Sequence, residues 1–152
     1  MPRNPEATQG RASFRALERA EIDRLLRRNR VGRLAYSFRD RVDIAPIHYV
    51  FADGWLYGRT APGTKLLTLA HNPWVAFEVD EHDSLLSWRS VVVKGRVYVI
   101  DDDTAPEVHE RALARLRALI PETLTDDDPT PARTTLFRIS LDEVDGRAAE
   151  VT

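Results

Sequence analysis

The stretch from Leu56 to Ala70 reads Leu-Tyr-Gly-Arg-Thr-Ala-Pro-Gly-Thr-Lys-Leu-Leu-Thr-Leu-Ala and predicts a short strand, a Gly/Pro turn and a helix. We expect the strand to end at Tyr57 and the helix to begin near Thr64. Backbone N–H groups and the positive end of the helix dipole would meet at this junction, which favours an anion there. Arg59 and Lys65 would add charge-assisted hydrogen bonds of about 1.5–3 kcal/mol each. The junction, which also holds Thr60, is therefore a predicted phosphate cradle.

The same junction comes close to the phosphate loop of nucleoside triphosphatases, Gly-x4-Gly-Lys-Ser/Thr, but Thr64 and Lys65 stand in the opposite order. The order matters because the Lys must reach the terminal phosphates while the following hydroxyl holds Mg²⁺. The chain also lacks the alternating strand and helix pattern of a parallel sheet. We therefore disfavour ATP or GTP hydrolysis and keep a generic phosphate cradle, which needs only a helix start and the basic pair.

Length and composition exclude several classes of protein. With 152 residues, 43% of them hydrophobic, the chain is expected to form one globular domain. The net charge of -2 gives no global attraction to nucleic acid or to an anionic membrane, so neither is an expected partner. The absence of Cys excludes disulfides, thiolate metal sites and Cys nucleophiles. No apolar run approaches the roughly 18 residues of a membrane span and no signal peptide is evident, so we predict a cytoplasmic protein.

The order of apolar patterns predicts the fold class. Residues 1–12 are polar and are expected to be a disordered segment ahead of a single domain over residues 13–152. Gly95, inside the longest apolar run, predicts a bulge or tight bend of the kind that curls a sheet into a barrel. The predicted fold is α+β, a mostly antiparallel six-stranded β-barrel with peripheral helices. The strands are expected at 33–38, 42–51, 55–57, 74–79, 88–100 and 136–141, the helices at 17–29, 64–71 and 106–120, and loops at 80–84 and 122–131, with Gly146 in a closing tail.

Other candidate functional residues have more than one interpretation. The arginines between Arg24 and Arg30 could contact nucleic acid, but a solvated helix face is preferred because no basic stripe with aromatic residues accompanies them. The histidines lack metal-ligand spacing, so no metal site is expected, and no nucleophile motif is found, so no catalytic residue is nominated. His48 either touches a ligand ring or forms hydrogen bonds at the barrel mouth. Trp88 either stacks on a planar ligand, fills an oligomer contact or packs in the core.

Several stretches, in their order and spacing, carry a family likeness. They are Glu21-Ile22 running into Val31-Gly-Arg-Leu-Ala35, then Pro46-Ile-His-Tyr49, then Leu56 to Lys65 with Asn72-Pro-Trp-Val-Ala-Phe77, then Trp88-Arg-Ser-Val-Val-Val-Lys-Gly95, and last Phe137-Arg-Ile139 through Gly146-Arg147. Over residues 17–147 the chain resembles the FMN-binding split-barrel superfamily. More narrowly, it is similar to the small pyridoxamine 5'-phosphate oxidase-like proteins, including the nitroimidazole-resistance (Nim) branch.

The resemblance implies a split β-barrel, a bound FMN and a homodimer whose flavin sites are made across the interface. It also implies a role for particular positions. The phosphate would be held after the third strand, the isoalloxazine would lie along the second strand, the ribityl chain would pass the end of the third strand, and the start of the long strand would reach the flavin. The matching residues are, in that order, Arg59, Thr60, Thr64 and Lys65; Ala45, Pro46, Ile47 and His48; Tyr57 and Gly58; and Trp88 and Ser90.

Departures from the family pattern bear on the substrate. Ser90 stands where true oxidases have Gln, and the end of the chain, Asp145 to Thr152, lacks their Trp- and Arg-rich segment for the substrate phosphate. Oxidation of vitamin B6 is therefore not expected. The His that the Nim branch often has near Gly58 is also absent. Three functions stay open: an FMN-dependent oxidoreductase, a reductase using the deazaflavin F420 on the same scaffold, and a flavin-binding, sensing or interaction module without turnover.

Overall fold

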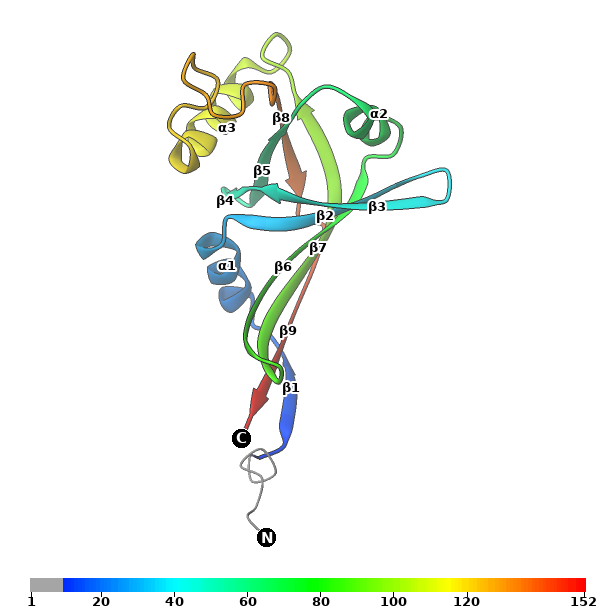
Figure 1. Ribbon diagram of the computed structural model, residues 1–152, viewed down its shortest axis with the longest axis vertical. Coiled ribbons are helices and arrows are strands. Elements are labelled where there is room, and N and C mark those ends of the chain that lie inside the picture. The colour runs from blue at the N-terminus through cyan, green and yellow to red at the C-terminus, as the bar shows by residue number, and fades with distance from the viewer. Residues whose placement is uncertain (1–9) are drawn as a thin grey trace.

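The computed structural model describes residues 10–152 and contains, over that range, nine strands and three helices (Figure 1). The helices are α1 (Arg19–Arg28), α2 (Thr64–His71) and α3 (Pro106–Leu119). The strands are β1 (Ala12–Ala16), β2 (Val31–Phe38), β3 (Arg41–His48), β4 (Val50–Ala52), β5 (Trp55–Thr60), β6 (Trp74–Ser84), β7 (Ser87–Ile100), β8 (Thr135–Ser140) and β9 (Glu143–Val151). Every strand pairing among them is antiparallel, which confirms the predicted α+β class.

The sheet closes into a split barrel because one bent segment supplies both of its ends. The strands follow the order β3-β2-β6-β7-β8-β5-β4, and β3 and β4 are consecutive in the chain. The chain bends between them at Tyr49, whose backbone N–H donates to the Arg30 carbonyl (2.9 Å) and whose hydroxyl donates to the Leu26 carbonyl (2.7 Å). The single strand predicted over 42–51 is therefore two strands, because this bend lets each half pair with a different neighbour.

Gly95 lies where β7 changes partners. The strand pairs with β9 up to Lys94 and with β8 from Val97 onward. A Cβ atom on Gly95 would lie 1.8 Å from the backbone oxygen of Ser140, so only Gly fits at this crossing. The pairing of β7 with β6 is regular at Gly95, so the glycine marks the change of partner and the close approach of the chain that joins β8 to β9.

Two strands were not predicted from the sequence, and two others are longer than predicted. β1 and β9 pair with each other from Ala12↔Val151 to Ala16↔Arg147, where a disordered start and a closing tail were expected. The segment 1–9 of the predicted disorder lies outside the described residues, whereas residue 12 already belongs to β1. β6 continues through the predicted loop at 80–84, and β5 continues past Tyr57 to Thr60. Most side chains of β1 and those of residues 82–84 face water, which is compatible with an antiparallel strand. Arg59 and Thr60 of β5, by contrast, have polar side chains that are buried.

Two apolar clusters hold the barrel and its helices. One fills the barrel and includes Leu34 and Phe77, each fully buried, together with Leu25 and Leu26 from the apolar stripe of α1. The other lies between α3 and the strands β5, β7 and β8, and contains Tyr57, Ile100, Ala112, Leu116 and Leu136. Within residues 10–152 no helix is both long and apolar enough to cross a membrane.

A polar network fixes the end of α1 to β6 and gives a testable stability effect. Glu81 accepts hydrogen bonds from Arg28 Nε and from Asn29 Nδ2, both at 2.8 Å. These bonds, the first from the Arg28 guanidinium, hold the pKa of Glu81 at about 2. Because this value lies below the ordinary 4.5, the stabilisation is complete above pH 4.5 and is lost as the pH falls towards 2.

We expect Glu81→Gln to lower the free energy of unfolding by about 1–2 kcal/mol at pH 7, because it removes charge-assisted hydrogen bonds. Urea denaturation at pH 7 and pH 3 measures the effect, and the gap between variant and wild type should narrow at the lower pH. Glu143→Gln is the control, since Glu143 is exposed and forms no ion pair within the described range. Equal loss in both variants would contradict the assignment.

Candidate functional site

The junction that was predicted to be a phosphate cradle lies between the end of β5 and the N-terminus of α2 (Figure 1). α2 begins at Thr64 and ends at His71, which confirms the predicted bounds. Gly63 precedes it with φ +156°, a conformation that other residues rarely adopt. No side chain caps this end, and the first turn contains no acidic residue. Its backbone N–H groups therefore have no competing carboxylate from the helix itself.

Lys65 stands half-buried at this helix end without a carboxylate partner. Its Nζ lies 6.0 Å from the centroid of the Tyr36 ring. No Asp or Glu oxygen within residues 10–152 lies within 4.0 Å of that nitrogen. Burial lowers the pKa of Lys65, and the positive charge of Arg133 lowers it further. A bound anion would reverse both penalties, so the geometry suits an anionic ligand.

Arg59 is engaged elsewhere. Its guanidinium donates to both oxygens of Asp128 (2.6 and 2.9 Å) and to Thr130 Oγ1 (2.7 Å), and only 7% of its side chain is exposed. The same bonds, with help from backbone N–H groups, hold the pKa of Asp128 well below its usual range. Arg59 was predicted to contact phosphate directly, but the structure pairs its charge with a buried carboxylate. The pair carries no net charge that could attract a ligand.

Arg133 is the basic residue that the sequence did not single out. It lies on the segment between α3 and β8, and its carbonyl accepts a hydrogen bond from Arg59 Nη1 (3.3 Å). Arg133 and His48 are both exposed, and both line a small cavity beside the end of α3. Nothing local marks Arg133, because its nearness to Lys65 depends on how a long loop folds back.

The predicted isoalloxazine positions lie along a free sheet edge. β3 pairs only with β2 within the described part of the chain, so its other edge presents unpaired backbone N–H and C=O groups. Along it, Ala45 is half-buried, Ile47 is buried, and Pro46 and His48 are exposed. These residues offer mainly backbone groups to a planar ligand.

The two positions predicted to lie beside the ribityl chain are packed against other side chains of the protein. The Tyr57 ring is buried in the cluster under α3, and its hydroxyl has no hydrogen-bond partner among the described residues. Gly58 faces the Phe137 ring, which a Cβ atom would approach to 2.6 Å. Thr60 is also buried, and its hydroxyl lies 3.4 Å from the Ala61 carbonyl. The side chains of Tyr57 and Thr60 therefore pack within the chain.

Trp88 and Ser90 are not brought to the cradle within one chain. They begin β7, at the end of the β6–β7 hairpin beside β1, whereas α2 lies towards the opposite end of the molecule (Figure 1). The Trp88 ring packs against Phe14, with ring centroids 6.3 Å apart. Any contact of these residues with a flavin at α2 requires a second chain.

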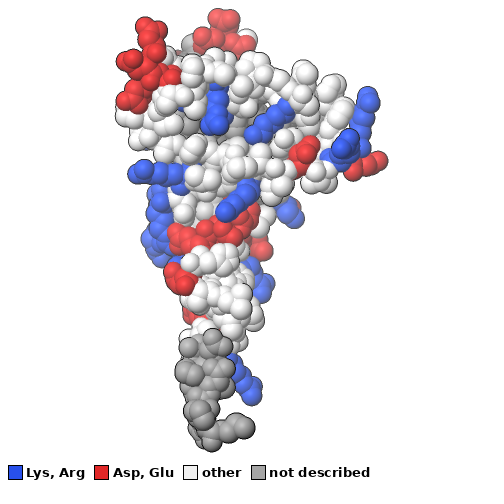
Figure 2. Space-filling model, viewed as in Figure 1, with Lys and Arg blue, Asp and Glu red and all other residues white. Residues whose placement is uncertain are grey.

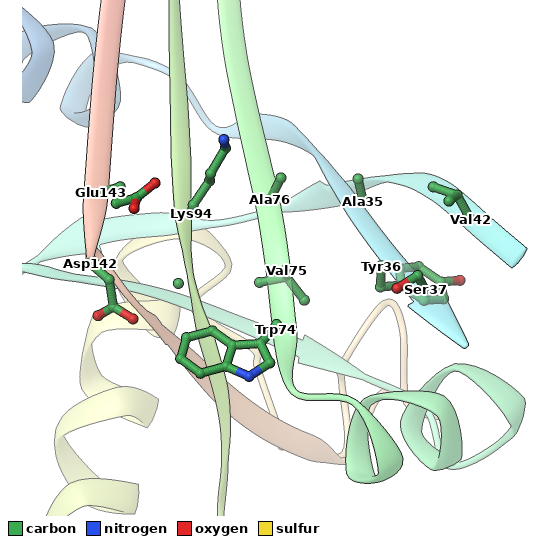
Figure 3. Close-up of a pocket in the computed structure, with 11 residues that line it drawn as sticks. Ala35, Tyr36, Ser37, Val42, Trp74, Val75, Ala76, Lys94, Asp142 and Glu143 are labelled. Carbon is green, nitrogen blue, oxygen red and sulfur yellow. The ribbon is translucent and has the colours of Figure 1, made fainter. Parts of the chain in front are cut away.

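A cavity of about 460 Å³ opens on the outer face of the sheet. Figure 3 shows its lining spread across the strands, with Tyr36, Ser37 and Val42 on one side and Asp142 and Glu143 on the other. Its floor is made of small or apolar side chains, and Trp74, which is 58% exposed, forms a wall. Tyr36 belongs both to this lining and to the surroundings of Lys65. The remaining lining residues are Ala35, Val75, Ala76, Lys94 and Gly95.

Acidic groups gather away from the cradle. Figure 2 shows them at the end of the molecule formed by α3 and its flanking loops, where Asp101, Asp102, Asp103, Asp126 and Asp127 are exposed. The carboxylates of Asp101, Asp102 and Asp103 lie within 4.8 Å of one another. Exposed carboxylates often lie this close without an ion, so we assign no metal there.

Comparison with known proteins identifies the family. The family model for pyridoxamine 5'-phosphate oxidase matches residues 18–148. A solved FAD-binding protein of Mesorhizobium loti is 29% identical, with a TM-score of 0.73 over 92% of this chain and 99% of its own. A FAD-binding protein of Mycobacterium smegmatis is 28% identical, with a TM-score of 0.65 over 90% of this chain and all of its own (100%).

A curated relative matches part of the chain. It is an uncharacterised protein of Rhizobium meliloti, 34% identical over 82 residues, and the match spans 54% of each chain, about half their length. The match of the family model extends from the first residues of α1 into β9, so it covers the barrel and the cradle together. The chain belongs to the pyridoxamine 5'-phosphate oxidase family, with its split-barrel fold.

Proposed function

We propose that this protein is a flavin-binding oxidoreductase that holds the flavin phosphate at the N-terminus of α2. The observation that carries the proposal is Lys65, a half-buried cation without a carboxylate partner in the described chain, at a helix end that no acidic residue caps. The FAD-binding proteins of M. loti and M. smegmatis, at 29% and 28% identity, support a flavin as the ligand. The fold alone would not carry this assignment, because one fold hosts many functions.

The residues of the site fit a flavin. Lys65, Thr64 and the first N–H groups of α2 would bind the phosphate, and the free backbone edge of β3 from Ala45 to His48 would bind the polar rim of the isoalloxazine. The bound flavin would supply the hydride or electron chemistry, while the protein supplies orientation and electrostatics. We assign no catalytic residue.

FMN is our specific proposal, because the cradle accounts for one terminal phosphate. FAD contains the same flavin and first phosphate, and the two solved relatives favour it as the second candidate. The test is to purify the protein, release its cofactor by denaturation and record the absorbance and mass. Release of FMN would confirm the proposal. Release of FAD would change the cofactor and leave the proposed function in place. A deazaflavin spectrum would replace the proposed function with F420-dependent reduction. A colourless protein that binds none of the three contradicts the flavin function.

Turnover needs its own test. The proposal expects that NADH or NADPH, alone or with a partner reductase, reduces the bound flavin in an anaerobic cuvette, seen as bleaching of its visible absorbance. A flavin that binds but resists both donors favours a binding or sensing module over an oxidoreductase. True pyridoxamine phosphate oxidation stays disfavoured, because Ser90 stands where the true oxidases have Gln.

We also propose a homodimer in which each flavin contacts both chains. Trp88 and Ser90 lie far from α2 in their own chain, so a partner chain is what would bring them to a flavin. The outer face of the sheet exposes Val42 (76%), Ile44 (69%) and Trp74 (58%), side chains that a second copy would bury. Light scattering coupled to gel filtration should give twice the 17.3 kDa chain mass. A monomer that binds flavin tightly would contradict the shared site. The cytoplasmic location remains part of this proposal.

Removing the Lys65 charge should weaken phosphate binding. We expect Lys65→Ala to raise the Kd for FMN about tenfold or more, since a charge-assisted hydrogen bond contributes about 1.5–3 kcal/mol. Riboflavin, which lacks the phosphate, should bind wild type and variant equally, and Lys65→Arg should retain most of the FMN affinity. Quenching of flavin fluorescence measures all three. FMN affinity that is unchanged in Lys65→Ala would place the phosphate elsewhere.

A further inference from the structure

We propose that Arg133, on the loop after α3, is a second ligand for the flavin phosphate, and that the buried Arg59–Asp128 pair is the device that positions it. The inference rests on the proposed function and assigns two roles that the sequence did not suggest. Arg133 becomes a binding residue, and Arg59 becomes a positioning residue in place of a direct phosphate ligand. The ligand class is the phosphate group shared by FMN and the flavin half of FAD.

The loop is organised around the Asp128 carboxylate. The backbone N–H groups of Leu124 and Thr130 donate to it, each at 2.9 Å. The carboxylate therefore links residues on both sides of it within the same loop. Arg59 of β5 then donates to the same carboxylate and to Thr130 Oγ1, which ties the closed loop to the barrel. Only 1% of the Asp128 side chain is exposed, so water does not compete for these bonds.

This anchor places Arg133 beside the cradle. Arg59 Nη1 also donates to the Arg133 carbonyl at 3.3 Å, so one guanidinium fixes both Asp128 and the backbone that carries Arg133. Arg133 lines the small cavity together with His48, which ends β3. It comes from a segment 68 residues beyond Lys65 in the chain. The loop therefore brings a cation to the end of β3, near enough to Lys65 for its charge to act on that residue.

Lys65 and Arg133 form a pair of like charges with no anion between them in the described chain. Neither side chain forms an ion pair with an Asp or Glu of residues 10–152. Burial lowers the pKa of Lys65, and repulsion by Arg133 lowers it further. Two cations held near one another cost free energy unless an anion binds both, and a phosphate offers several oxygens for doing so. Arg59 cannot serve in this way, because Asp128 already neutralises it.

The first experiment compares flavins with and without phosphate. Purified Arg133→Gln protein is titrated with FMN, FAD and riboflavin, and each Kd is read from flavin fluorescence. We expect a roughly tenfold weaker Kd for FMN and for FAD and no change for riboflavin, because only the phosphate contact is lost. Arg111→Gln is the matched control: Arg111 is an exposed α3 residue with no ion pair in the described chain, and all three affinities should stay at the wild-type value.

The second experiment tests the positioning role with a double-mutant cycle. Asp128→Asn should weaken FMN binding in the wild-type background and add no further loss in the Arg133→Gln background, because the anchor acts through Arg133. Additive losses would overturn the positioning role. The Arg133→Gln variant should fold normally, because the Arg133 residue is exposed.

The outcomes separate this inference from the function on which it rests. If Lys65→Ala weakens FMN binding and Arg133→Gln does not, Arg133 is a solvated side chain and the inference falls while the flavin function stands. If Arg133→Gln weakens riboflavin as much as FMN, the contact is not with phosphate and the inference also falls. If the wild type binds no flavin, the proposed function itself is overturned.

Discussion

Replacing Asp128 by alanine is expected to lower the melting temperature by roughly 10 °C, because breaking a buried ion pair leaves an uncompensated charge in a chain of this size. Arg59 would keep its buried guanidinium but lose the carboxylate that accepts its bonds at 2.6 and 2.9 Å. The backbone N–H groups of Leu124 and Thr130 would lose the same acceptor. Thermal unfolding followed by circular dichroism measures the shift.

Two controls isolate the pair from the loop. Asp126→Ala removes an exposed carboxylate two residues away and should leave the melting temperature within about 2 °C of wild type. Replacing both partners, as Arg59→Met with Asp128→Leu, should restore part of the loss, because no buried charge is then left unpaired. A melting temperature of Asp128→Ala equal to that of Asp126→Ala would show that the pair does not hold the loop.

Short sequence signals correctly predicted the elements whose ends they mark. Gly63 before Thr64 and the Asn72-Pro73 pair after His71 gave both ends of α2 correctly. Pairings between distant segments left no such trace. β1 and β9 join residues separated by most of the chain, as in Ala12↔Val151, and neither is apolar enough to be recognised alone. The residues from Asp80 to Ser84 were predicted as a loop because they are polar, yet they continue β6 where its hairpin extends into water.

The residues of the candidate site also fall into those that local sequence predicts and those that depend on distant contacts. Lys65 could be found from sequence because the helix start that exposes it is encoded within a few residues. The partner of Arg59 could not, since it lies 69 residues further along the chain within a run of three aspartates. Two of these, Asp126 and Asp127, are the solvated loop residues that the sequence predicted, and nothing local distinguishes the third, which turns inward. Arg133 depends on that turn and was missed with it.

Replacing Gly95 by alanine is expected to lower the free energy of unfolding by about 3 kcal/mol, at the upper end of the range for overpacking. The new Cβ would stand 1.8 Å from the Ser140 carbonyl oxygen, far inside van der Waals contact, and the clashing atom is backbone. Relief would require β7 to separate from the segment that joins β8 to β9, where the Arg96 N–H also donates to Ser140 Oγ (3.0 Å). Urea denaturation gives the change in unfolding free energy.

The origin of that loss can be checked with neighbouring substitutions. Lys94→Ala introduces an alanine one residue earlier, at an exposed position of β7. It should lower the free energy of unfolding by less than about 1 kcal/mol. Adding Ser140→Gly to Gly95→Ala should not rescue stability, because it removes the hydroxyl and leaves the carbonyl in place. Rescue by that second substitution, or a loss in Gly95→Ala no larger than in Lys94→Ala, would mean that the crossing tolerates a side chain. The change of partner at Gly95 would then be set by the pairing of β8 and β9 with β7, and not by the close approach of the two backbones.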